Sequence, residues 1–498
     1  MKIFSVNQVR EWDTATINSE SISSFDLMER AAVCCYKWIA HHSRKHHRFH
    51  IFCSNGNNGG DGLALARMLI QNYDGVYLYI IESTKKESPD FTTNLASLQH
   101  YLRHIYIIRS PENFPDFQKN DIIIDAIFGT GLNKPLDGII ASLVAHINKS
   151  QVKVISIDIP TGLFADRSSK GNNVIMATHT LTFQNYKLAL LLAENAQYTG
   201  QLHILDIGLD KQFEKTTNCR YELTELVNIK IIYRPRKAFS HKGNYGFAAI
   251  IAGSYGMMGA AVLATGACLR SGVGKLSCLI PACGYDIIQA DMPEAMCQSS
   301  GQEYISTLPE LSKFTSVGIG PGIGRYASHN QLLKELFENY KKPTVIDADA
   351  LNILAENTGL LKSVPQNSIL TPHPGEFIRL FGSSENQFDQ LELALEKSKE
   401  MGVIIILKGH NTFIATPGGK GYFNSTGNSG MATGGSGDVL TGILTALLAQ
   451  GYDSMEAAIL GVYIHGLAGD IAAQQFSQEG MIAGDIIQCL GTAFKQIS

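Results

Sequence analysis

The sequence contains few charged residues and no long apolar run, and these deficits exclude several classes of protein. Charged residues make up only 17% of the 498 residues, which argues against a disordered or coiled-coil chain. Lys and Arg total 41 against 45 Asp and Glu, so the chain has no excess of positive charge for nucleic acid or an anionic membrane. No apolar stretch approaches the roughly 18 residues of a membrane span. The N-terminus, MKIFSVNQVREWDT, lacks the apolar core of a secretory signal.

Cysteine pairs with the spacing of a metal-binding motif are also absent. The nine cysteines are odd in number and irregularly spaced, and no C-x-x-C pair occurs, which excludes a zinc site of that kind. Such a set in a large chain is typical of reduced thiols in a reducing compartment. With 45% hydrophobic residues, the chain is long enough for two or three globular domains. We therefore expect a soluble, cytoplasmic, multidomain protein.

Short apolar runs alternate with helical patterns in the first half of the chain. Most of these runs are rich in β-branched residues and apolar on both faces, as buried parallel strands are. The candidate strands are His50–Cys53, Val76–Ile81, His104–Ile108, Asp121–Ile127, Lys153–Ile159, His179–Phe183 and Gln201–Ile207. Helical patterns such as that of Leu63–Gln71 lie between several of them. This alternation predicts a doubly wound α/β sheet.

Residues 210–237 are polar, charged and weakly periodic, and we place a domain boundary there, near residue 220. A second α/β pattern follows. Its candidate strands are Phe247–Ala252, Lys275–Ile280, Ser316–Ile319, Thr344–Ile346, Ser368–Leu370 and Val403–Leu407. The glycine motifs of the two halves differ, so the halves are not an internal repeat. The expected domains are residues 1–218 and 225–498.

The segment His41–His50 contains five histidines and three basic residues. A metal-capturing role is one interpretation, but no Cys or carboxylate partner lies nearby in the sequence. We therefore favour a solvated helix end that leads into a strand.

Three polar, glycine-containing segments follow predicted strands of the first half. Ser54–Gly62 reads S-N-G-N-N-G-G-D-G and precedes a helix, and its glycines together with free helix N–H groups suit a phosphate. The other two segments are Asp125–Leu132 and Ser156–Gly162. Ligands bind outside the carboxyl ends of the strands in an open α/β sheet, so the three segments predict one site. A tight turn or a helix cap would explain each segment alone, but their combination favours function.

The N-N-G-G-D-G, D-x-x-x-G-T-G and S-I-D-I-P-T-G motifs resemble those of the YjeF N-terminal domain, the NAD(P)H-hydrate epimerase, over roughly residues 1–215. The resemblance implies a Rossmann-like fold that interconverts the R and S epimers of NADHX and NADPHX, the hydrated, damaged forms of the reduced cofactors. The implied substrate contacts are Asn57, Asn58, Gly59, Gly60, Asp61, Gly129, Thr130, Gly131, Leu132, Asn133, Lys134, Pro135 and Asp158. The resemblance also implies a potassium ion (K⁺) held by Asn58, Asp125 and Thr161.

The residue types in these segments suit the implied chemistry. Hard cations take oxygen ligands, which Asn, Asp and Thr side chains supply. Epimerisation must break and re-form a bond at the hydrated carbon, and a carboxylate near that carbon could shuttle the proton. We take Asp158 as this catalytic group. Lys187 matches a lysine of the family, although Ala189 replaces the glycine expected after it, and the role of Lys187 is left open.

Four glycine-containing segments mark the second half of the chain. They are His241–Gly246, Gly318–Gly324, Thr371–Glu376 and Gly427–Asp438, and a Gly259-Ala260-Ala261 run follows the first of them. In the last segment, Gly-Gly-Ser-Gly precedes a helix and can form an anion hole. Asp438 lies in the first turn, where a carboxylate can take a proton from a substrate hydroxyl, although a helix cap is the simpler alternative. Lys408–Thr412 follows a strand and could hold nucleotide phosphates, whereas His373 fits a structural or a functional role equally.

The H-P-G-E and G-M-A-T-G-G-S-G-D-V-L-T-G motifs resemble the YjeF C-terminal domain, the ADP-dependent NAD(P)H-hydrate dehydratase, on a ribokinase-like fold. The resemblance implies phosphoryl transfer to the hydroxyl of (6S)-NAD(P)HX and elimination to NAD(P)H, with Mg²⁺ neutralising the phosphates and ADP rather than ATP as donor. The implied hydrate contacts are Ala260 or Ala261, Gly322 or Gly324, His373 and the catalytic Asp438. The implied nucleotide contacts are Lys408, Gly409, His410, Asn411, Thr412 and Gly437.

Two other interpretations remain open. The second domain could phosphorylate a vitamin or a sugar, because such kinases share the fold and the Gly-Asp motif. The first domain could be a non-catalytic nucleotide-sensing or RNA-related module. The H-P-G-E and M-A-T-G-G segments favour the dehydratase, and the joint presence of Asn58, Asp125, Asp158 and Thr161 favours a working epimerase. We expect a fused two-activity enzyme that acts on small molecules, forms a homo-oligomer and binds neither nucleic acid nor membrane.

Overall fold

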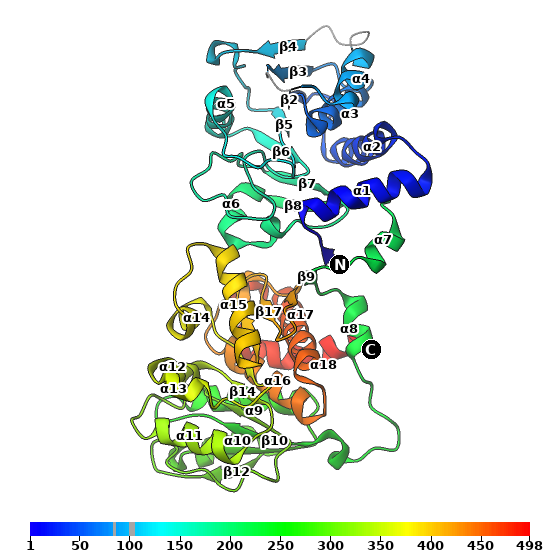
Figure 1. Ribbon diagram of the computed structural model, residues 1–498. Helices are drawn as coiled ribbons and strands as arrows, with labels where there is room; N and C mark the ends of the chain where they lie inside the picture. The colour runs from blue at the N-terminus through cyan, green and yellow to red at the C-terminus, as the bar shows by residue number, and fades with distance from the viewer. Residues whose placement is uncertain (83–85, 99–104) are drawn as a thin grey trace. The chain divides into compact units, whose positions relative to one another are not determined.

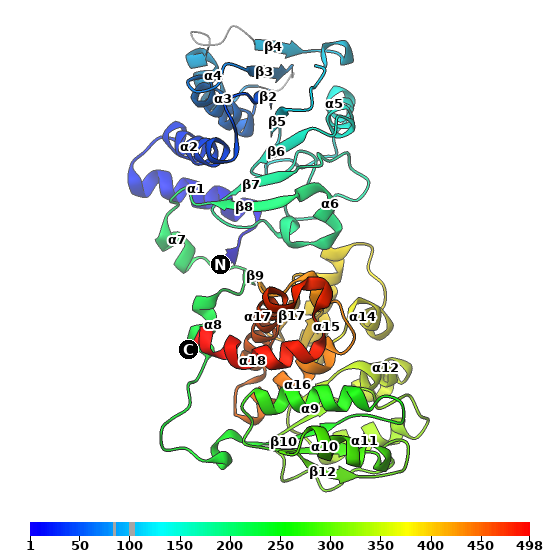
Figure 2. The ribbon, with the colours of Figure 1, turned by 180° about the vertical axis from the view of Figure 1, so that it is seen from behind.

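A computed structural model describes residues 1–82, 86–98 and 105–498. These residues divide into two compact units. The N-terminal unit comprises Lys2–Cys219 with Asn386–Phe388, and the C-terminal unit comprises Met1, Arg220–Glu385 and Asp389–Ser498. Figures 1 and 2 show the elements of both units from opposite sides.

The N-terminal unit is built on a parallel sheet with the strand order β4-β3-β2-β5-β6-β7-β8. The strands are β2 (Arg48–Cys53), β3 (Val76–Ile81), β4 (Ile105–Ile108), β5 (Asp121–Ala126), β6 (Lys153–Ile157), β7 (His179–Phe183) and β8 (Gln201–Leu205). The predicted strands are thus present, although His104 lies outside the described residues. The order reverses where β2 pairs with β5, and such a switch point leaves a crevice at the carboxyl ends of the two strands.

Helices cover both faces of this sheet, as a doubly wound fold requires. The helices of the unit are α1 (Val6–Glu20), α2 (Ser24–His42), α3 (Asn57–Ile70), α4 (Pro89–Leu98), α5 (Gly138–Lys149), α6 (Ala196–Thr199) and α7 (Lys211–Thr216). The ribbons place α2, α3 and α4 on one face and α5 on the other (Figures 1 and 2). Successive residues of a strand therefore enter different cores: Ile51 packs on the α2 and α3 side and Phe52 on the α5 side.

The histidine-rich segment ends a helix, as expected. His41 and His42 occupy the last turn of α2, where positive charge suits the helix dipole, and the chain then enters β2. The ring of His42 stacks on Trp38 with centroids 4.0 Å apart. Among the described residues, no group of three or more His, Cys, Asp or Glu side chains is arranged to hold a metal ion.

The C-terminal unit contains the strand order β9-β18-β17-β16-β15-β14-β13-β10-β11-β12, parallel except where β17 runs against β16 and β18. The strands are β9 (Tyr221–Leu223), β10 (Phe247–Ile251), β11 (Lys275–Ile280), β12 (Met296–Ser299), β13 (Ser316–Ile319), β14 (Thr344–Ile346), β15 (Ile369–Leu370), β16 (Ile404–Leu407), β17 (Phe413–Ala415) and β18 (Gly421–Phe423). The sequence did not indicate β9, β12, β17 or β18, which are short and lie toward the edges of the parallel array.

Helices of 4 to 27 residues surround this sheet. They are α8 (Leu226–Ile232), α9 (Met258–Arg270), α10 (Tyr285–Asp291), α11 (His329–Asn339), α12 (Ala348–Glu356), α13 (Thr358–Leu361), α14 (Pro374–Phe381), α15 (Gln387–Met401), α16 (Ser436–Ala449), α17 (Ser454–Gly480) and α18 (Ala483–Ile497). α16 packs against α9 and α17 and is buried from Val439 to Ala449. By length and composition α17 could cross a membrane, but most of its apolar stretch is buried within the protein, as in the core helix of a globular fold. All nine cysteines are free thiols.

Two candidate active sites

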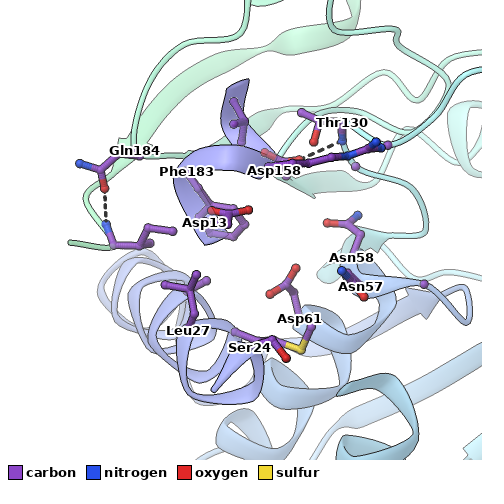
Figure 3. A pocket seen from close by; sticks show the side chains of 18 of the residues that line it. Asp13, Ser24, Leu27, Asn57, Asn58, Asp61, Thr130, Asp158, Phe183 and Gln184 are labelled. Carbon is purple, nitrogen blue, oxygen red and sulfur yellow. Dashed lines mark hydrogen bonds between the residues drawn. The ribbon is translucent and has the colours of Figure 1, made fainter. Parts of the chain in front are cut away.

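The N-terminal unit contains a cavity of about 600 Å³ at the carboxyl ends of β2 and β5, where the strand order reverses. Its walls come from α1, α2, the start of α3 and the loops that follow β5, β6 and β7. Figure 3 shows Asp13, Asp61 and Asp158 facing this space from three separate elements. The three motifs of the first half therefore border one cavity, as their positions at strand ends predicted.

The N-N-G-G-D-G motif belongs to a helix rather than to a loop. α3 begins at Asn57, six residues earlier than the helical pattern indicated. A Cβ atom on Gly59 would lie 1.7 Å from the Ser54 carbonyl oxygen, and one on Gly62 would lie 2.6 Å from Cys53 Sγ. Glycine is therefore required for α3 to start directly against the end of β2. The helix N-terminus, with its free N–H groups, borders the cavity and can bind an anion.

Asp158 is held in a fixed position at the end of β6. Its backbone has a φ of +69°, which is unusual for a non-glycine residue. Its Oδ1 lies 2.8 Å from Lys187 Nζ, and its Oδ2 accepts a hydrogen bond of 3.0 Å from the Thr130 N–H. Burial alone would raise the pKa of Asp158, but Lys187 and the Thr130 N–H hold it below its ordinary value. Asp158 is therefore an ionised carboxylate at neutral pH.

Lys187 lies in the loop that follows β7 and is held by the end of that strand. Its Nζ also donates to Thr182 Oγ1 at 2.9 Å and to the Phe183 carbonyl at 3.0 Å, and the side chain is buried. The Lys187 Nζ thus contacts Asp158 and two oxygen atoms of β7.

A second buried carboxylate, Asp125, lies at the end of β5. Its Oδ1 accepts a 2.6 Å hydrogen bond from Thr161 Oγ1, and its Oδ2 accepts 2.7 Å and 2.9 Å bonds from Ser156 Oγ and the Thr161 N–H. Burial raises the pKa of Asp125 despite these bonds. The nearby Asn58 has a buried Nδ2 that lacks a hydrogen-bond partner within the described part of the chain.

The structure separates the predicted epimerase residues into groups. Those that line the cavity are Asn57, Asn58, Asp61, Gly129, Thr130, Gly131, Leu132 and Asp158. Gly59 and Gly60 are buried beneath the start of α3, and Asn133, Lys134 and Pro135 lie outside the cavity lining. Sequence reasoning missed Asp13, which lines the cavity from α1 and belongs to no motif.

In the C-terminal unit, Asp438 lies in the first turn of α16. Gly435 caps this helix with a φ of +89°, a backbone conformation that favours glycine. Burial, and then the negative charge of Asp347, raise the pKa of Asp438 to about 7, and Lys408 offsets part of the rise. Asp438 can therefore take or release a proton near neutral pH, beside a helix N-terminus that can bind an anion.

Lys408 joins the motifs of this site. Its Nζ lies 2.8 Å from Asp347 Oδ1 and 3.9 Å from Glu376 Oε2, and a Cβ on Gly437 would lie 3.4 Å from it. Asp347 also accepts a 2.8 Å hydrogen bond from Thr441 Oγ1 of α16. Lys408, Glu376, Gly437 and Asp438 thus meet at one place. Sequence reasoning missed Asp347, although it follows an apolar strand just as Asp125 and Asp158 do.

His373 acts as the cap of α14. Its Nδ1 accepts hydrogen bonds from the N–H groups of Gly375 at 3.0 Å and Glu376 at 3.4 Å, while Glu376 accepts a 2.8 Å bond from the His373 N–H. This reciprocal capping explains the H-P-G-E motif structurally. The imidazole remains half exposed, so it can also touch a ligand.

The other predicted dehydratase residues lie in two groups. A Cβ on Gly322 would lie 3.0 Å from the Ala260 Cβ, whereas Ala261 is buried in the core. The structure therefore places Ala260, rather than Ala261, beside Gly322, and Gly324 donates its N–H to Asp349 at 2.9 Å. Residues 408–412 form the turn between β16 and β17, in which the Thr412 hydroxyl donates to the Gly409 carbonyl at 3.0 Å. His410 and Asn411 lie in the same turn.

Comparison with known proteins identifies the family. The family model of the YjeF-related protein N-terminus matches residues 24–189, and that of NAD(P)H-hydrate dehydratase matches residues 248–491. The bifunctional NAD(P)H-hydrate repair enzyme of Moorella thermoacetica is 35% identical over 98% of this chain and 96% of its own length. This chain belongs to the bifunctional NAD(P)H-hydrate repair enzymes.

Solved structures resemble the part of this repair enzyme that carries Asp438. A ribokinase-like superfamily protein from Enterococcus faecalis is 26% identical, with a TM-score of 0.50 over 57% of this chain and 98% of that one. The ADP/ATP-dependent NAD(P)H-hydrate dehydratase of Bacillus subtilis, co-crystallised with ATP/Mg²⁺, is 31% identical, with a TM-score of 0.49 over 56% and 99% of the two chains. The ribokinase-like fold predicted for the C-terminal half of the repair enzyme is confirmed.

Proposed function

We propose that the N-terminal unit interconverts the R and S epimers of NADHX and NADPHX, and that the C-terminal unit dehydrates the S epimer at the expense of ADP. One observation carries the proposal. Each unit of this repair enzyme combines a glycine-rich helix N-terminus with an adjacent aspartate whose pKa is shifted, which is a site for a phosphate-bearing substrate that exchanges protons.

In the epimerase site, the N-terminus of α3 and the Gly129–Leu132 loop hold the phosphate-bearing part of the substrate. Arg10 and Lys86 line the same cavity and add positive charge for the pyrophosphate. The hydrated ring then lies toward Asp158, which exchanges a proton with the hydroxyl group. Asp158 is suited to accept this proton because Lys187 keeps it ionised.

The residues predicted to hold K⁺ fit a monovalent cation. Asp125 and Thr161 contribute buried oxygen atoms in direct contact with each other. Turning the Asn58 amide over would replace its unpartnered buried nitrogen with an oxygen, the atom type that a hard cation takes. When bound, K⁺ would supply the positive charge that the buried Asp125 carboxylate lacks.

In the dehydratase site, Asp438 accepts the proton of the substrate hydroxyl as that oxygen attacks the terminal phosphoryl group of ADP and AMP leaves. The N–H groups at the start of α16 stabilise the transferred phosphoryl group, and the Lys408–Thr412 turn holds the nucleotide. The bond between the ring carbon and the phosphorylated oxygen then breaks, and phosphate leaves. The adjacent carbon loses a proton, which restores the double bond of NAD(P)H. Mg²⁺ would neutralise the nucleotide phosphates.

An absorbance assay at the reduced-nicotinamide band tests both activities. The protein is mixed with R plus S NADHX, K⁺, Mg²⁺ and either ADP or ATP. Complete recovery of NADH is expected, faster with ADP. Recovery of the S fraction alone, under conditions of slow spontaneous epimerisation, would contradict the epimerase. If neither nucleotide gives NADH, and a vitamin precursor accumulates in phosphorylated form, the C-terminal unit is a kinase instead.

The free thiols of the enzyme support a proposal for its cellular compartment. Nine free cysteines are typical of a reducing compartment, and we place the enzyme in the cytoplasm. The homo-oligomer remains a prediction that light scattering would test.

A further inference from the structure

Asp13 faces the epimerase cavity from an element that none of the sequence motifs includes. It lies in the middle of α1, outside residues 24–189 that the family model matches. The close view shows its carboxyl group in the same space as those of Asp61, from α3, and Asp158, from the loop after β6 (Figure 3). Carboxyl groups from more than one wall therefore face the cavity.

Asp13 and Asp158 differ in their hydrogen bonds and salt bridges. Asp158 is fixed by Lys187 and by the Thr130 N–H. Asp13 makes neither a salt bridge nor a hydrogen bond with any residue that the structure describes. Burial, followed by repulsion from Asp158, raises the pKa of Asp13 to about 6, although Lys187 lowers it in part. Below about pH 6 the two carboxyl groups therefore hold one proton, which lies mainly on Asp13.

The reaction itself requires proton transfer on two sides of the ring. The R and S epimers carry the hydroxyl on opposite faces of the hydrated carbon. One carboxyl group cannot reach both hydroxyl positions while the rest of the substrate stays bound in one orientation. Epimerisation without release therefore needs one proton-handling group on each face.

We propose that Asp13 is the second catalytic carboxyl group of the epimerase, serving one face of the hydrated ring while Asp158 serves the other. This inference rests on the epimerase function proposed above. Protonated Asp13 gives its proton to the departing hydroxyl, the C–O bond breaks, and the ring nitrogen lone pair forms a C=N⁺ bond as water leaves. Water then adds to the opposite face and loses a proton to ionised Asp158. The proton then returns from Asp158 to Asp13 through solvent, which regenerates the enzyme, so atoms and charge balance without another reactant. The reverse reaction exchanges the two roles.

The charged groups around Asp13 support this division of roles. Asp61 of α3 favours its neutral form, because burial and then the charges of Asp158 and Asp13 raise its pKa well above the ordinary value. Lys187 is occupied by Asp158. The same cavity is lined by Arg10, one turn before Asp13 on α1, by Lys86, which precedes α4, and by Asp90 in the first turn of α4. The surrounding groups thus keep Asp158 ionised and favour a protonated Asp13 below about pH 6.

The test compares Asp13→Asn with Asp13→Glu and with Glu11→Gln, an exposed residue of the same helix outside the cavity lining. Purified epimers are incubated in H₂¹⁸O, and inversion and ¹⁸O incorporation are followed separately. We expect the Asp13→Asn variant to interconvert the epimers about 10²- to 10⁴-fold more slowly. Through Asp158 it should still exchange the hydroxyl oxygen of one epimer for ¹⁸O, with retention of configuration. Asp13→Glu should regain part of the inversion rate, and Glu11→Gln should match wild type.

A pH profile provides a second readout. In wild type, kcat/KM for inversion should fall above pH 6, as the shared proton is lost, and this limb should be missing in Asp13→Asn. Inversion by Asp13→Asn at the wild-type rate would overturn the inference, as would equal loss of ¹⁸O exchange into both epimers. If wild type itself fails to invert either epimer, the proposed epimerase function fails instead, which is a separate outcome.

Discussion

Asp158 and Asp438 carry the same side chain, but their neighbours move their pKa values in opposite directions. Asp158 is buried and still ionised because the Lys187 ammonium lies 2.8 Å from it. Burial, and then the negative charge of Asp347, raise the pKa of Asp438 to about 7, and Lys408 offsets only part of this rise. The first residue is thus arranged as a proton acceptor, and the second as a group that gains or loses a proton at working pH.

Replacing Lys187 with methionine tests how Asp158 is kept ionised. The ion pair is lost while most of the buried volume is kept, so the pKa of Asp158 should rise and its ionised fraction at pH 7 should fall. We expect epimerisation at pH 7 to slow by about 10²-fold or more, with the acid limb of its pH profile moved to higher pH. Lys187→Arg keeps the charge and is the control. An unshifted acid limb in the methionine variant would contradict this role of Lys187.

Replacing Asp438 with asparagine separates activity from stability. Dehydration should slow by about 10²- to 10⁴-fold, and the wild-type rate should rise with pH through about 7, as Asp438 ionises. The folded-state pKa of about 7 lies above the value of about 3.9 for unfolded Asp, so the folded chain binds a proton that the unfolded chain releases between these values. The free energy of unfolding therefore decreases as pH rises from about 4 to about 7.

The asparagine variant lacks this decrease. It should unfold at a higher temperature than wild type at pH 8, by about 2–4 °C for each kcal/mol relieved, and at nearly the same temperature at pH 4. Calorimetry at the two pH values measures the difference. A variant that is inactive and also less stable at pH 8 would show that Asp438 contributes to folding rather than only to chemistry.

Site residues could be predicted where a local pattern marks them. Asp438 follows a glycine at the start of a helix, and Asp125 and Asp158 lie at strand ends four residues before a glycine, which are patterns visible in the sequence. Asp347 follows an apolar strand too, but its partner Lys408 lies 61 residues away, so their pairing is set by the sheet. Asp13 lies within a helix without any motif, and only the tertiary fold buries it beside Asp158. Sequence alone therefore reveals the residues with local signatures.

At the scale of elements, the apolar strands of the parallel sheets were predictable because both of their faces are buried. β17 and β18 were not, since each has three residues and their antiparallel pairing depends on the turn between them. The start of α3 was also placed too late, because the three glycines of its first turns are unfavourable in an isolated helix. Contact with the end of β2 overrides that preference, as the Gly59 geometry shows.

A pair of adjacent glycines tests this contact. Gly59→Ala puts a Cβ 1.7 Å from the rigid Ser54 carbonyl, whereas Gly60→Ala puts one 2.7 Å from the thioether sulfur of Met28, which can move. Replacing glycine with alanine at an unobstructed helix position would stabilise the protein by about 0.5–1 kcal/mol. Any loss of stability in these variants therefore reports the steric clash. We expect Gly59→Ala to destabilise the N-terminal unit by about 1–3 kcal/mol or more and to slow epimerisation, with Gly60→Ala affected less.

Thermal unfolding and both activities should be measured on the same samples. Dehydration of the S epimer should be unchanged in both glycine variants, because the C-terminal unit has its own core. Equal behaviour of the two variants would mean that α3 is free to shift away from β2.

At the scale of the whole molecule, the two activities belong to units with separate cores and separate sites. The epimerase cavity is lined within Lys2–Cys219, and the residues around Asp438 all lie within the C-terminal unit. The S epimer is a small molecule that the first site releases and the second site binds. The chemistry of each site therefore depends on its own unit.

Mixing two single-site variants tests this independence. Asp158→Asn alone should recover NADH only from the S fraction, and Asp438→Asn alone should recover almost none. An equimolar mixture should recover NADH from both epimers, because the S epimer can diffuse from the working epimerase of one chain to the working dehydratase of another. Wild type at the same concentration of working sites is the control for rate. Recovery limited to the S fraction in the mixture would show that the substrate must pass between two sites of one chain, and that covalent fusion of the two units is needed for repair.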